Sequence, residues 1–375
     1  MRVLIAPDSF GGTLSAAEAA SAIAEGWAAG AAHDDVVTRP LSDGGPGFVD
    51  VLHTTLGGEL LAVTVPDPLG RTVPATVLVA GDTAYVESAQ ACGLHLLAPH
   101  ERDPMWATSY GVGVLLAAAV ETGARTVVVG LGGSGTNDGG AGMFAALGAP
   151  PIGEDGLALP YGGAPLVACA GLADQPRLRG VALVAALDVD NPLLGLTGAS
   201  AVYGPQKGAS RDDVQVLDAA LARWAEVLGR SLPTAPAGLG ALPGGGAAGG
   251  LGAALLALGA RRASGIGMVR ELIGLDSAVD AADLVVTGEG SFDWQSLRGK
   301  VAAGVAEAAL ARGLPCLVLA GRVEVGRREL AAAGVAAAYS ISDHLGSVER
   351  AMSDAAGGLT ALAERVAREW SRSPR

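Results

Sequence analysis

Residues 126–142 read Thr126-Val-Val-Val-Gly-Leu-Gly-Gly-Ser-Gly-Thr-Asn-Asp-Gly-Gly-Ala-Gly142, and this stretch sets the pattern for the whole chain. The β-branched run 126–129 predicts a buried strand, the glycine-rich segment predicts a loop, and the apolar residues 143–147 predict a helix. Such a stretch can hold an anion, because backbone N–H groups and a helix N-terminus point at one place. The alternative is a tight structural loop that needs glycine for positive φ, and the glycines alone do not decide between the two.

Length and composition limit the classes of protein to which the chain can belong. Its 375 residues predict two domains, and its net charge of −13 argues against nucleic acid as a partner. No uncharged apolar run is long enough for a membrane span, and the apolar part of Met1–Pro7 is too short for a signal peptide. The three cysteines are widely spaced and show neither a disulfide framework nor metal spacing. We therefore expect a soluble cytoplasmic protein with no membrane partner.

The chain contains only two lysines, Lys207 and Lys300, and arginine supplies the other side chains of its Lys and Arg total. Each lysine stands next to glycine, in Gly-Pro-Gln-Lys207-Gly and Arg-Gly-Lys300. A compact ammonium group within glycine-rich backbone is suited to a phosphate. The alternative is a pair of solvated surface lysines placed by chance.

The start of the chain alternates strands and helices. Residues 2–7 predict a strand that ends at Asp8, and Ser15 with Glu18 predicts a capping box for a helix to about residue 29. A second predicted strand at 36–41 ends at Asp43, and a helix is predicted at 48–55. Both strands thus end in aspartate beside a glycine-containing turn, which is where open α/β sheets bind ligands.

The middle of the chain differs in character from its two ends. Short predicted strands at 60–65, 72–79 and 83–87 indicate a hairpin-rich sheet. The further elements predicted in this middle part are helices at 107–122, 213–229 and 251–258 and a strand at 181–186. The alternation returns near the C-terminus, with strands at 283–287, 315–320 and 336–341, a helix at 301–312 and an amphipathic helix at 347–370.

These patterns predict an α/β protein of two domains. Residues 1–58 and 276–375 would form a doubly wound, Rossmann-like parallel-sheet domain built from both termini. Residues 59–275 would form an inserted mixed α/β domain, with the active site in the cleft between the two. The oligomeric state stays open, with a homodimer as one alternative.

Carboxylates follow most of the predicted strands. They are Asp8, Asp43, Asp138, Asp188, Asp190, Glu289 and Asp293. A single aspartate at such a position is commonly only a helix cap. Asp188 and Asp190 share one face if their strand continues, and a carboxylate pair of that kind suits Mg²⁺. Together with the two lysines and the glycine loops, the carboxylates predict phosphoryl transfer.

Motifs of other enzyme classes are missing from the sequence. There is no P-loop, and no Gly-x-Gly-x-x-Gly follows the first strand, which weakens a dinucleotide-dependent dehydrogenase as an interpretation. No Gly-x-Ser-x-Gly elbow with histidine partners is present, which argues against a serine hydrolase.

A series of motifs runs along nearly the whole chain. They are Ile5-Ala-Pro-Asp-Ser-Phe10, Asp43-Gly-Gly, Tyr110-Gly-Val-Gly113, Gly132-Gly-Ser-Gly-Thr-Asn-Asp-Gly-Gly140, Asp188-Val-Asp-Asn-Pro192, Tyr203-Gly-Pro-Gln-Lys-Gly208, Gly249-Gly-Leu-Gly252, and Thr287-Gly-Glu-Gly with Asp293, Gln295-Ser and Gly299-Lys300. In this order the motifs resemble the bacterial glycerate kinase family of type 1. The resemblance implies a two-domain α/β fold that uses ATP and Mg²⁺ to phosphorylate D-glycerate, usually to 2-phosphoglycerate, with 3-phosphoglycerate as the alternative product.

The resemblance also implies roles for individual residues. Those expected to be catalytic are Asp8, Asp190, Asp293, Lys207 and Lys300. Those expected to bind substrate or phosphate are Ser9, Asp43, Gly132, Gly133, Ser134, Thr136, Asn137, Asn191 and Glu289. Those expected to position Mg²⁺ are Asp138, Asp188 and Asp190. Within this set, Lys207 and Lys300 would meet phosphates, and Asp293 or Asp8 would orient the acceptor hydroxyl.

Three positions depart from the family pattern. Gly11 stands where the family usually has lysine, Pro46 where it has glutamate, and Ser291 where it has arginine. ATP and glycerate are both anions, so the loss of two cations removes partners for them, and Arg298 or Arg322 are candidates to replace them. Three interpretations therefore stay open: an active glycerate kinase, a kinase for another acceptor, and a ligand-binding relative without catalysis.

Overall fold

The computed structural model describes residues 1–178, 180–294, 296–297 and 301–371. It divides into two compact units. Unit 1 comprises Met1–Asp43, Asp50–Thr55 and Ile266–Arg375, and unit 2 comprises Gly44–Val49 and Leu56–Gly265. The predicted fold class is confirmed, because one unit holds a parallel sheet made from both ends of the chain and the other holds a mixed sheet.

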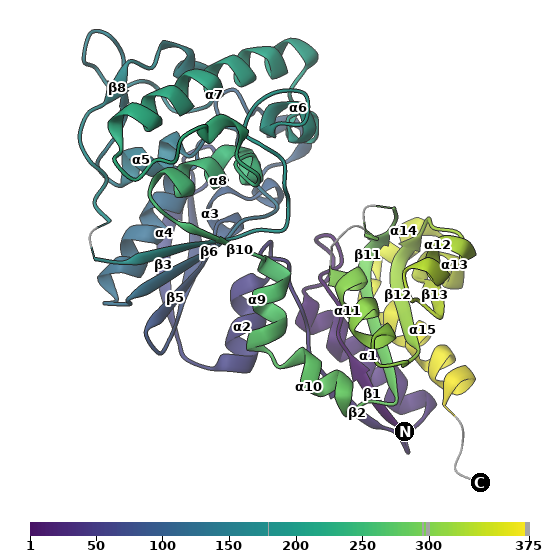
Figure 1. Ribbon diagram of the computed structural model, residues 1–375. Helices are drawn as coiled ribbons and strands as arrows, with labels where there is room; N and C mark the ends of the chain where they lie inside the picture. Colours follow the sequence, from purple (N-terminus) through teal and green to yellow (C-terminus); the bar gives the residue numbers. More distant parts are fainter. Residues whose placement is uncertain (179, 295, 298–300, 372–375) are drawn as a thin grey trace. The chain divides into compact units, whose positions relative to one another are not determined.

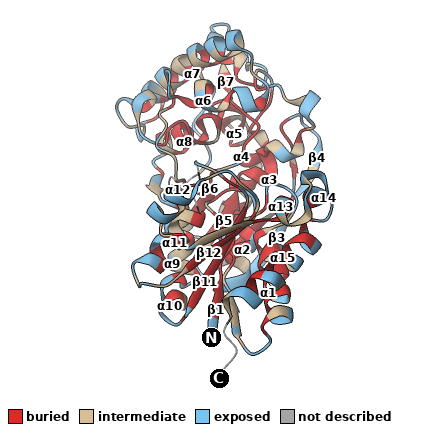
Figure 2. Ribbon diagram, turned by 90° about the vertical axis from the view of Figure 1, so that its right-hand side faces the viewer, coloured by how far each residue is buried: buried red, intermediate tan, exposed pale blue. Residues whose placement is uncertain are grey.

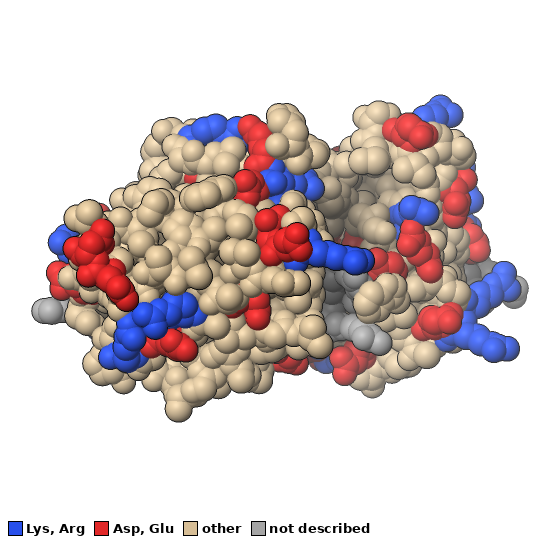
Figure 3. All heavy atoms as spheres, turned by 90° about the horizontal axis from the view of Figure 1, so that it is seen from above, with Lys and Arg blue, Asp and Glu red and all other residues tan. Residues whose placement is uncertain are grey.

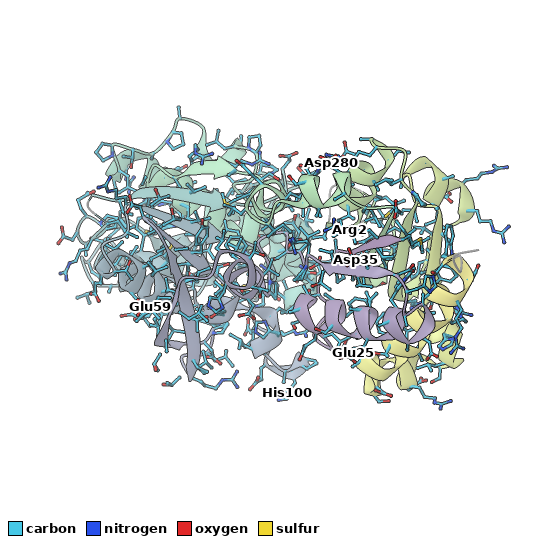
Figure 4. The ribbon with its side chains drawn as sticks, turned by 90° about the horizontal axis from the view of Figure 1, so that it is seen from below. Arg2, Glu25, Asp35, Glu59, His100 and Asp280 are labelled. Atoms are coloured by element: carbon cyan, nitrogen blue, oxygen red, sulfur yellow. The ribbon has the colours of Figure 1, made fainter. Side chains whose placement is uncertain are left out.

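Unit 1 is built on five parallel strands in the order β13-β12-β11-β1-β2. Their bounds are Arg2–Ile5 (β1), Asp35–Thr38 (β2), Leu284–Phe292 (β11), Cys316–Val323 (β12) and Ala337–Ser340 (β13). The N-terminal strand β1 lies between β2 and β11, so strands from the two ends of the chain are hydrogen-bonded neighbours (Figure 1). Arg2 and Asp35 are register partners where β1 and β2 begin, with Arg2 Nε 3.5 Å from Asp35 Oδ2 (Figure 4).

Helices cover both faces of this sheet (Figure 2). Helices α1 (Ala16–Gly30) and α15 (Ala355–Trp370) pack on one face, and α9 (Gly265–Leu272), α10 (Leu275–Asp280) and α11 (Val301–Leu310) lie on the other. Alternation along the strands explains both contacts, since Val3 and Ile5 face the α1–α15 layer while Leu4 is buried on the opposite side. The predicted capping box begins α1, with Glu18 N donating to Ser15 Oγ at 3.2 Å and Ser15 N to Glu18 Oε2 at 2.8 Å.

Close contact between α1 and α15 depends on two glycines. A Cβ at Gly26 would overlap the carbonyl oxygen of Thr360, and a Cβ at Gly30 would overlap that of Glu364. The first and last long helices of the chain therefore pack backbone against backbone.

Unit 2 is built on six strands in the order β10-β9-β6-β5-β4-β3. Their bounds are Glu59–Pro66 (β3), Thr72–Ala80 (β4), Thr83–Glu87 (β5), Thr126–Gly130 (β6), Ala182–Ala186 (β9) and Arg261–Ala263 (β10). The predicted hairpins are β3–β4 and β4–β5, and from β5 onward the sheet is parallel. A short antiparallel pair, β7 (Pro151–Ile152) and β8 (Gly171–Leu172), lies outside this sheet.

Helices and 3-10 turns complete both units. In unit 2 they are α3 (Ala89–Cys92), η1 (Leu94–Leu96), η2 (Pro99–Glu101), α4 (Tyr110–Glu121), α5 (Ala141–Ala146), η3 (Ala164–Ala168), α6 (Ala199–Tyr203), η4 (Pro205–Lys207), α7 (Arg211–Ser231), η5 (Leu239–Ala241) and α8 (Ala247–Ala257). In unit 1 they also include α12 (Arg327–Ala332), α13 (Ile341–Leu345) and α14 (Val348–Ser353), while α2 (Phe48–Leu56) contributes residues to both units. None of the described helices has the length and apolarity needed to cross a membrane.

Two predicted elements differ from the structure for local reasons. Strand β11 runs to Phe292, because its residues stay paired with β12 beyond Thr287, so Glu289 lies inside a strand and not in a loop. The single predicted helix 347–370 is two helices, because Asp354 interrupts it and caps α15, with Asp354 Oδ1 accepting from Gly357 N at 3.1 Å.

Charged side chains are interspersed on the face shown in Figure 3. Arginine and acidic side chains lie scattered there among uncharged atoms. Among the described residues visible on that face, there is no continuous basic surface of the kind that binds nucleic acid.

Candidate functional site

The carboxyl edge of the unit 1 sheet encloses a cavity of about 480 Å³, which we call the edge cavity. Residues at or beyond the ends of β1, β11 and β12 form one wall, and helices α13, α14 and α15 form the other. The residues that line it are Asp8, Ser9, Phe10, Gly11, Thr13, Glu289, Gly290, Ser291, Asp293, Gly321, Arg322, Ile341, Ser342, Val348, Ala351, Met352 and Ala355. Four residues predicted for the site, Asp8, Ser9, Glu289 and Asp293, are thus brought together by the parallel topology.

Backbone contacts fix the carboxylates of this wall. Asp8 N donates to Gly288 O at 2.8 Å, which ties the turn after β1 to β11, and Asp8 Oδ1 accepts from Ser9 N at 2.7 Å. Asp293 lies in a turn in which Ser296 N donates to Asp293 Oδ1 at 3.3 Å and Asp293 N donates to Ser296 Oγ at 3.1 Å. Glu289 lies within β11 and is only 7% exposed.

In unit 2, the glycine-rich loop after β6 is held from inside by Lys207. Lys207 is only 1% exposed, and its Nζ donates to Ser134 Oγ at 2.8 Å and to Thr136 O at 2.7 Å. Burial lowers the pKa of the ammonium to about 8, although the nearby Asp138 carboxylate opposes the shift. The geometry therefore makes Lys207 a support of the loop, and its predicted role at a phosphate remains a prediction.

The carboxylate of Asp138 already accepts four hydrogen bonds from residues of unit 2. Its Oδ2 accepts from Ser109 N and Ser109 Oγ, both at 2.8 Å, and from Gly142 N at 3.1 Å, while its Oδ1 accepts from Gly140 N at 3.1 Å. Burial raises the pKa of this carboxyl, and these hydrogen bonds oppose the shift. A group with four donors already in place favours a structural role at the start of α5, and its metal role stays a prediction.

Much of the predicted phosphate loop is interior. Ser134, Thr136 and Asn137 are buried, and Asn137 Nδ2 donates to Ser200 Oγ at 2.9 Å. Gly133 is exposed and has φ of +63°, and Gly132 is half-buried. If the loop holds an anion, the backbone N–H groups at Gly132 and Gly133 are therefore better placed to reach it than the side chains are.

The carboxylates after β9 contact the neighbouring strand β10 and the residue that follows it. Because β9 ends at Ala186, Asp188 and Asp190 do not continue a strand, and the same-face argument for them does not apply. Asp188 Oδ1 accepts from Ser264 Oγ at 2.6 Å, and Asp190 Oδ1 lies 2.5 Å from Arg262 Nη2, with the aspartate side chain 81% exposed.

The remaining predicted residues have other positions. Asn191 is held in place by two contacts, since its Nδ2 donates to Thr197 O at 2.8 Å and its Oδ1 accepts from Tyr203 OH at 2.7 Å. Asp43 lies in unit 1 but does not line the edge cavity. Lys300, Gln295 and Arg298 lie outside the described residues.

Sequence reasoning missed two kinds of functional neighbour. Ser109, Arg262 and Ser264 contact predicted carboxylates, yet they lie 29 to 76 residues away along the chain and belong to no charged motif. The apolar wall made by Val348 and Met352 was also missed, because its residues read as the face of an ordinary amphipathic helix. The described residues contain no group of three or more histidine, cysteine or acidic side chains arranged to hold a metal ion.

Comparison with known proteins decides the family. A model of the glycerate kinase family matches residues 3–371. The chain belongs to the glycerate kinase family. A glycerate kinase from Halalkalibacterium halodurans is 39% identical over 379 residues, covering 99% of this chain and 99% of that protein. The glycerate 2-kinase of Escherichia coli K12 is 39% identical, covering 98% of this chain and 97% of that protein.

Two further comparisons concern a relative without a functional name and a solved structure. A protein of Mycobacterium bovis that carries no functional name is 46% identical, covering 98% of this chain and 91% of that protein. A solved structure from Salmonella typhimurium LT2 has a TM-score of 0.77 at 39% identity and covers 98% of both chains. Membership in the family implies an ATP-dependent kinase that acts on small molecules.

The three departures from the glycerate kinase pattern fall in two places. Gly11 and Ser291 both line the edge cavity. Pro46 lies in unit 2 against the glycine-rich loop, since a Cβ at Gly133 would come within 2.9 Å of its ring. The two positions at which the resemblance predicts a missing cation therefore share one cavity, while the third lies against the exposed part of the loop.

Proposed function

We propose that this protein transfers a phosphoryl group from ATP to a hydroxyl of D-glycerate and forms 2-phosphoglycerate, with 3-phosphoglycerate as the alternative product. The observation that carries the proposal is the family match over residues 3–371, to which relatives named glycerate kinase correspond along nearly their whole length. Residues of the predicted set lie in each of the two units.

Phosphoryl transfer requires the protein to position the acceptor hydroxyl and to neutralise the negative charge of the phosphates. In a loose phosphoryl transfer the acceptor hydroxyl must be held in line, and a carboxylate such as Asp8 or Asp293 suits that role. Backbone N–H groups at Gly132 and Gly133 suit a phosphate or the glycerate carboxylate. Arg322 and Lys300, the latter outside the described residues, are the cations that we propose meet the phosphates.

Mg²⁺ would arrive with the nucleotide, because this ion keeps several waters and takes one or two carboxylates together with phosphate oxygens. Asp190 and Asp188 fit that requirement in donor chemistry, and Asp190 is exposed enough to exchange Arg262 for the ion. Asp138 fits it poorly, because its oxygens already accept four hydrogen bonds. When bound, Mg²⁺ would offset the charge that develops on the transferred phosphoryl group.

The test is an assay of the purified full chain with ATP, Mg²⁺ and D-glycerate. ADP release that depends on D-glycerate is expected. Adding enolase in a second step identifies the product, because enolase dehydrates 2-phosphoglycerate and not 3-phosphoglycerate. No glycerate-dependent ADP release across a range of ATP and Mg²⁺ concentrations would count against the proposal.

A second candidate is a relative with another acceptor or without catalysis, and Gly11 and Ser291 are the observation that favours it. Both positions lack the cation that the family pattern has there. Screening other hydroxy acids in the same ADP-release assay tests a changed acceptor. ATP binding without turnover for any of them would support the non-catalytic alternative.

A further inference from the structure

The edge cavity of unit 1 has two walls of different chemistry. The polar wall carries the carboxylates of Asp8, Glu289 and Asp293 and the guanidinium of Arg322. The apolar wall is formed by Ile341 and by residues of α14 and α15, which are Val348, Ala351, Met352 and Ala355. A cavity with one apolar side and a few convergent polar groups is typical of sites for organic ligands.

Part of the apolar wall is exposed to solvent. Met352 is 64% exposed and Val348 is 46% exposed, although both belong to α14, in which Ala351 is buried. Large apolar side chains that stay in water at the rim of a cavity lose that contact with water when a flat apolar ligand covers them. The volume of about 480 Å³ lies within the range of about 300–1,000 Å³ that is usual for small-ligand sites.

Charge narrows the identity of the ligand. Three carboxylates line the polar wall against one guanidinium, and Arg322 Nε is itself 2.9 Å from Glu324 Oε1. This excess of negative charge repels the charged groups of an anion wherever no cation matches them, but it does not repel the neutral parts of a ligand. The same carboxylates accept hydrogen bonds from neutral hydroxyl groups, as a sugar would offer them.

We propose that the edge cavity binds the nucleoside part of ATP. The purine ring lies against Val348 and Met352, and the ribose hydroxyls donate to carboxylates of the polar wall. Arg322 is the one cation among the described residues that line the cavity, so it is the group assigned to the phosphates. This assignment rests on the proposed ATP-dependent function and adds the site at which unit 1 recognises the nucleotide.

The experiment uses the full chain and two variants of the apolar wall. Met352→Glu places a charge on a side chain that is already mostly exposed, so the fold can accept it. Val348→Glu is an independent variant, since Val348 is the first residue of α14 and an acidic residue there suits the helix N-terminus. Leu310→Glu is the matched control, because Leu310 is 56% exposed at the end of α11 and does not line the cavity.

The measurements are calorimetric Kd values for adenosine and for inorganic triphosphate, together with KM for ATP and for D-glycerate. Both wall variants should raise the Kd of adenosine and the KM of ATP by about tenfold or more, and leave the KM of D-glycerate within about twofold. Adenosine is uncharged, so weaker binding of adenosine cannot come from repulsion between the new glutamate and phosphate groups. Triphosphate should bind the variants and the wild type alike, and Leu310→Glu should match the wild type throughout.

The outcomes separate this inference from the proposed function. Unchanged adenosine binding in both folded wall variants overturns the inference, and so does a rise in the KM of D-glycerate alone, which would assign the cavity to the acceptor. If the wild type binds adenosine but phosphorylates no glycerate, and the wall variants lose adenosine binding, the proposed function is wrong and the nucleoside site is supported. A wild type that binds neither adenosine nor ATP overturns both.

Discussion

Ser291 and Arg322 are register partners on the neighbouring parallel strands β11 and β12, and both line the edge cavity. From the motif resemblance, we expect the family to have an arginine where this chain has Ser291. Arg322 therefore brings a guanidinium to the adjacent strand, at the position opposite the one that lost it. We infer that Arg322, which lies outside that motif, takes the place of the arginine expected at Ser291.

Arg322→Ala should raise the KM for ATP by about tenfold to a hundredfold, because one charge-assisted hydrogen bond is worth about 1.5–3 kcal/mol. Steady-state kinetics at varied ATP measures this. Arg328→Ala is the matched control, since Arg328 is an exposed arginine of α12 outside the cavity. An Arg322→Ala enzyme with the kinetics of the wild type would show that Arg322 meets no phosphate.

Restoring the two lost cations should have unequal costs. Ser291 lies in a strand with an exposed side chain, so Ser291→Arg should leave the free energy of unfolding nearly unchanged, and it should change activity little because Arg322 already supplies a cation on the adjacent strand. Gly11 has open space around it but a φ of +53°, so Gly11→Lys should cost about 1–2 kcal/mol of stability, whatever its effect on activity. Urea unfolding and ADP-release assays on both variants measure the two effects, and equal stability losses would contradict the argument.

Lys207 should make stability depend on pH in one direction. Its pKa is about 8 in the folded protein and 10.5 in the unfolded chain, so between these values the unfolded state binds the extra proton and the free energy of unfolding rises with pH. The gain contributed by this group amounts to about 3 kcal/mol over that window. It is absent below pH 8, where both states are protonated.

The measurement compares the wild type with Lys207→Met in urea at pH 7 and at pH 10. Other groups, including Cys92 with its pKa raised to about 12 by burial, are common to both proteins and largely cancel in the comparison. The wild type should gain stability over the variant as pH rises, because the neutral amine still has hydrogens to donate to Ser134 and Thr136. A pH-independent difference would contradict the lowered pKa.

Asp138→Ala should destabilise the protein by about 3 kcal/mol or more, because three backbone N–H groups and the Ser109 hydroxyl lose their acceptor. The loss should be the same with and without Mg²⁺, as thermal melting in both buffers will show. Asp190→Ala is the contrasting variant, since its carboxylate is mostly exposed and its removal should change stability by less than about 0.5 kcal/mol. A destabilisation by Asp138→Ala that appears only with Mg²⁺ present would instead support a metal role.

The sequence predicted elements well where a local pattern decides them. The strand, loop and helix expected around residues 126–147 are β6, the glycine-rich loop and α5, because β-branched residues, glycines and apolar residues each act locally. The ends of elements were less predictable. Glu289 lies in a strand that continues only because β12 pairs with it, and no residue near Glu289 reveals that partner.

The directions of side chains in the candidate site were not predictable from motifs. Lys207 was expected at a phosphate because of its glycine neighbours, yet it points inward and bonds Ser134, which lies 73 residues earlier in the chain. Whether a lysine faces solvent or the interior depends on what packs over it, and that is a property of the whole unit. The apolar wall of the edge cavity likewise exists only because α14 and α15 fold back over the ends of β1, β11 and β12.

The position of β1 between β2 and β11 has a consequence for synthesis on the ribosome. The first strand can pair with β2 soon after both emerge, but its other neighbour, β11, is not available until residues 284–292 have left the ribosome, which takes on the order of tens of seconds at normal translation rates. During that time the whole of unit 2 is made and is free to fold from contiguous chain. The side of β1 that pairs with β11 must therefore stay unpaired and protected from aggregation until the last quarter of the protein is made.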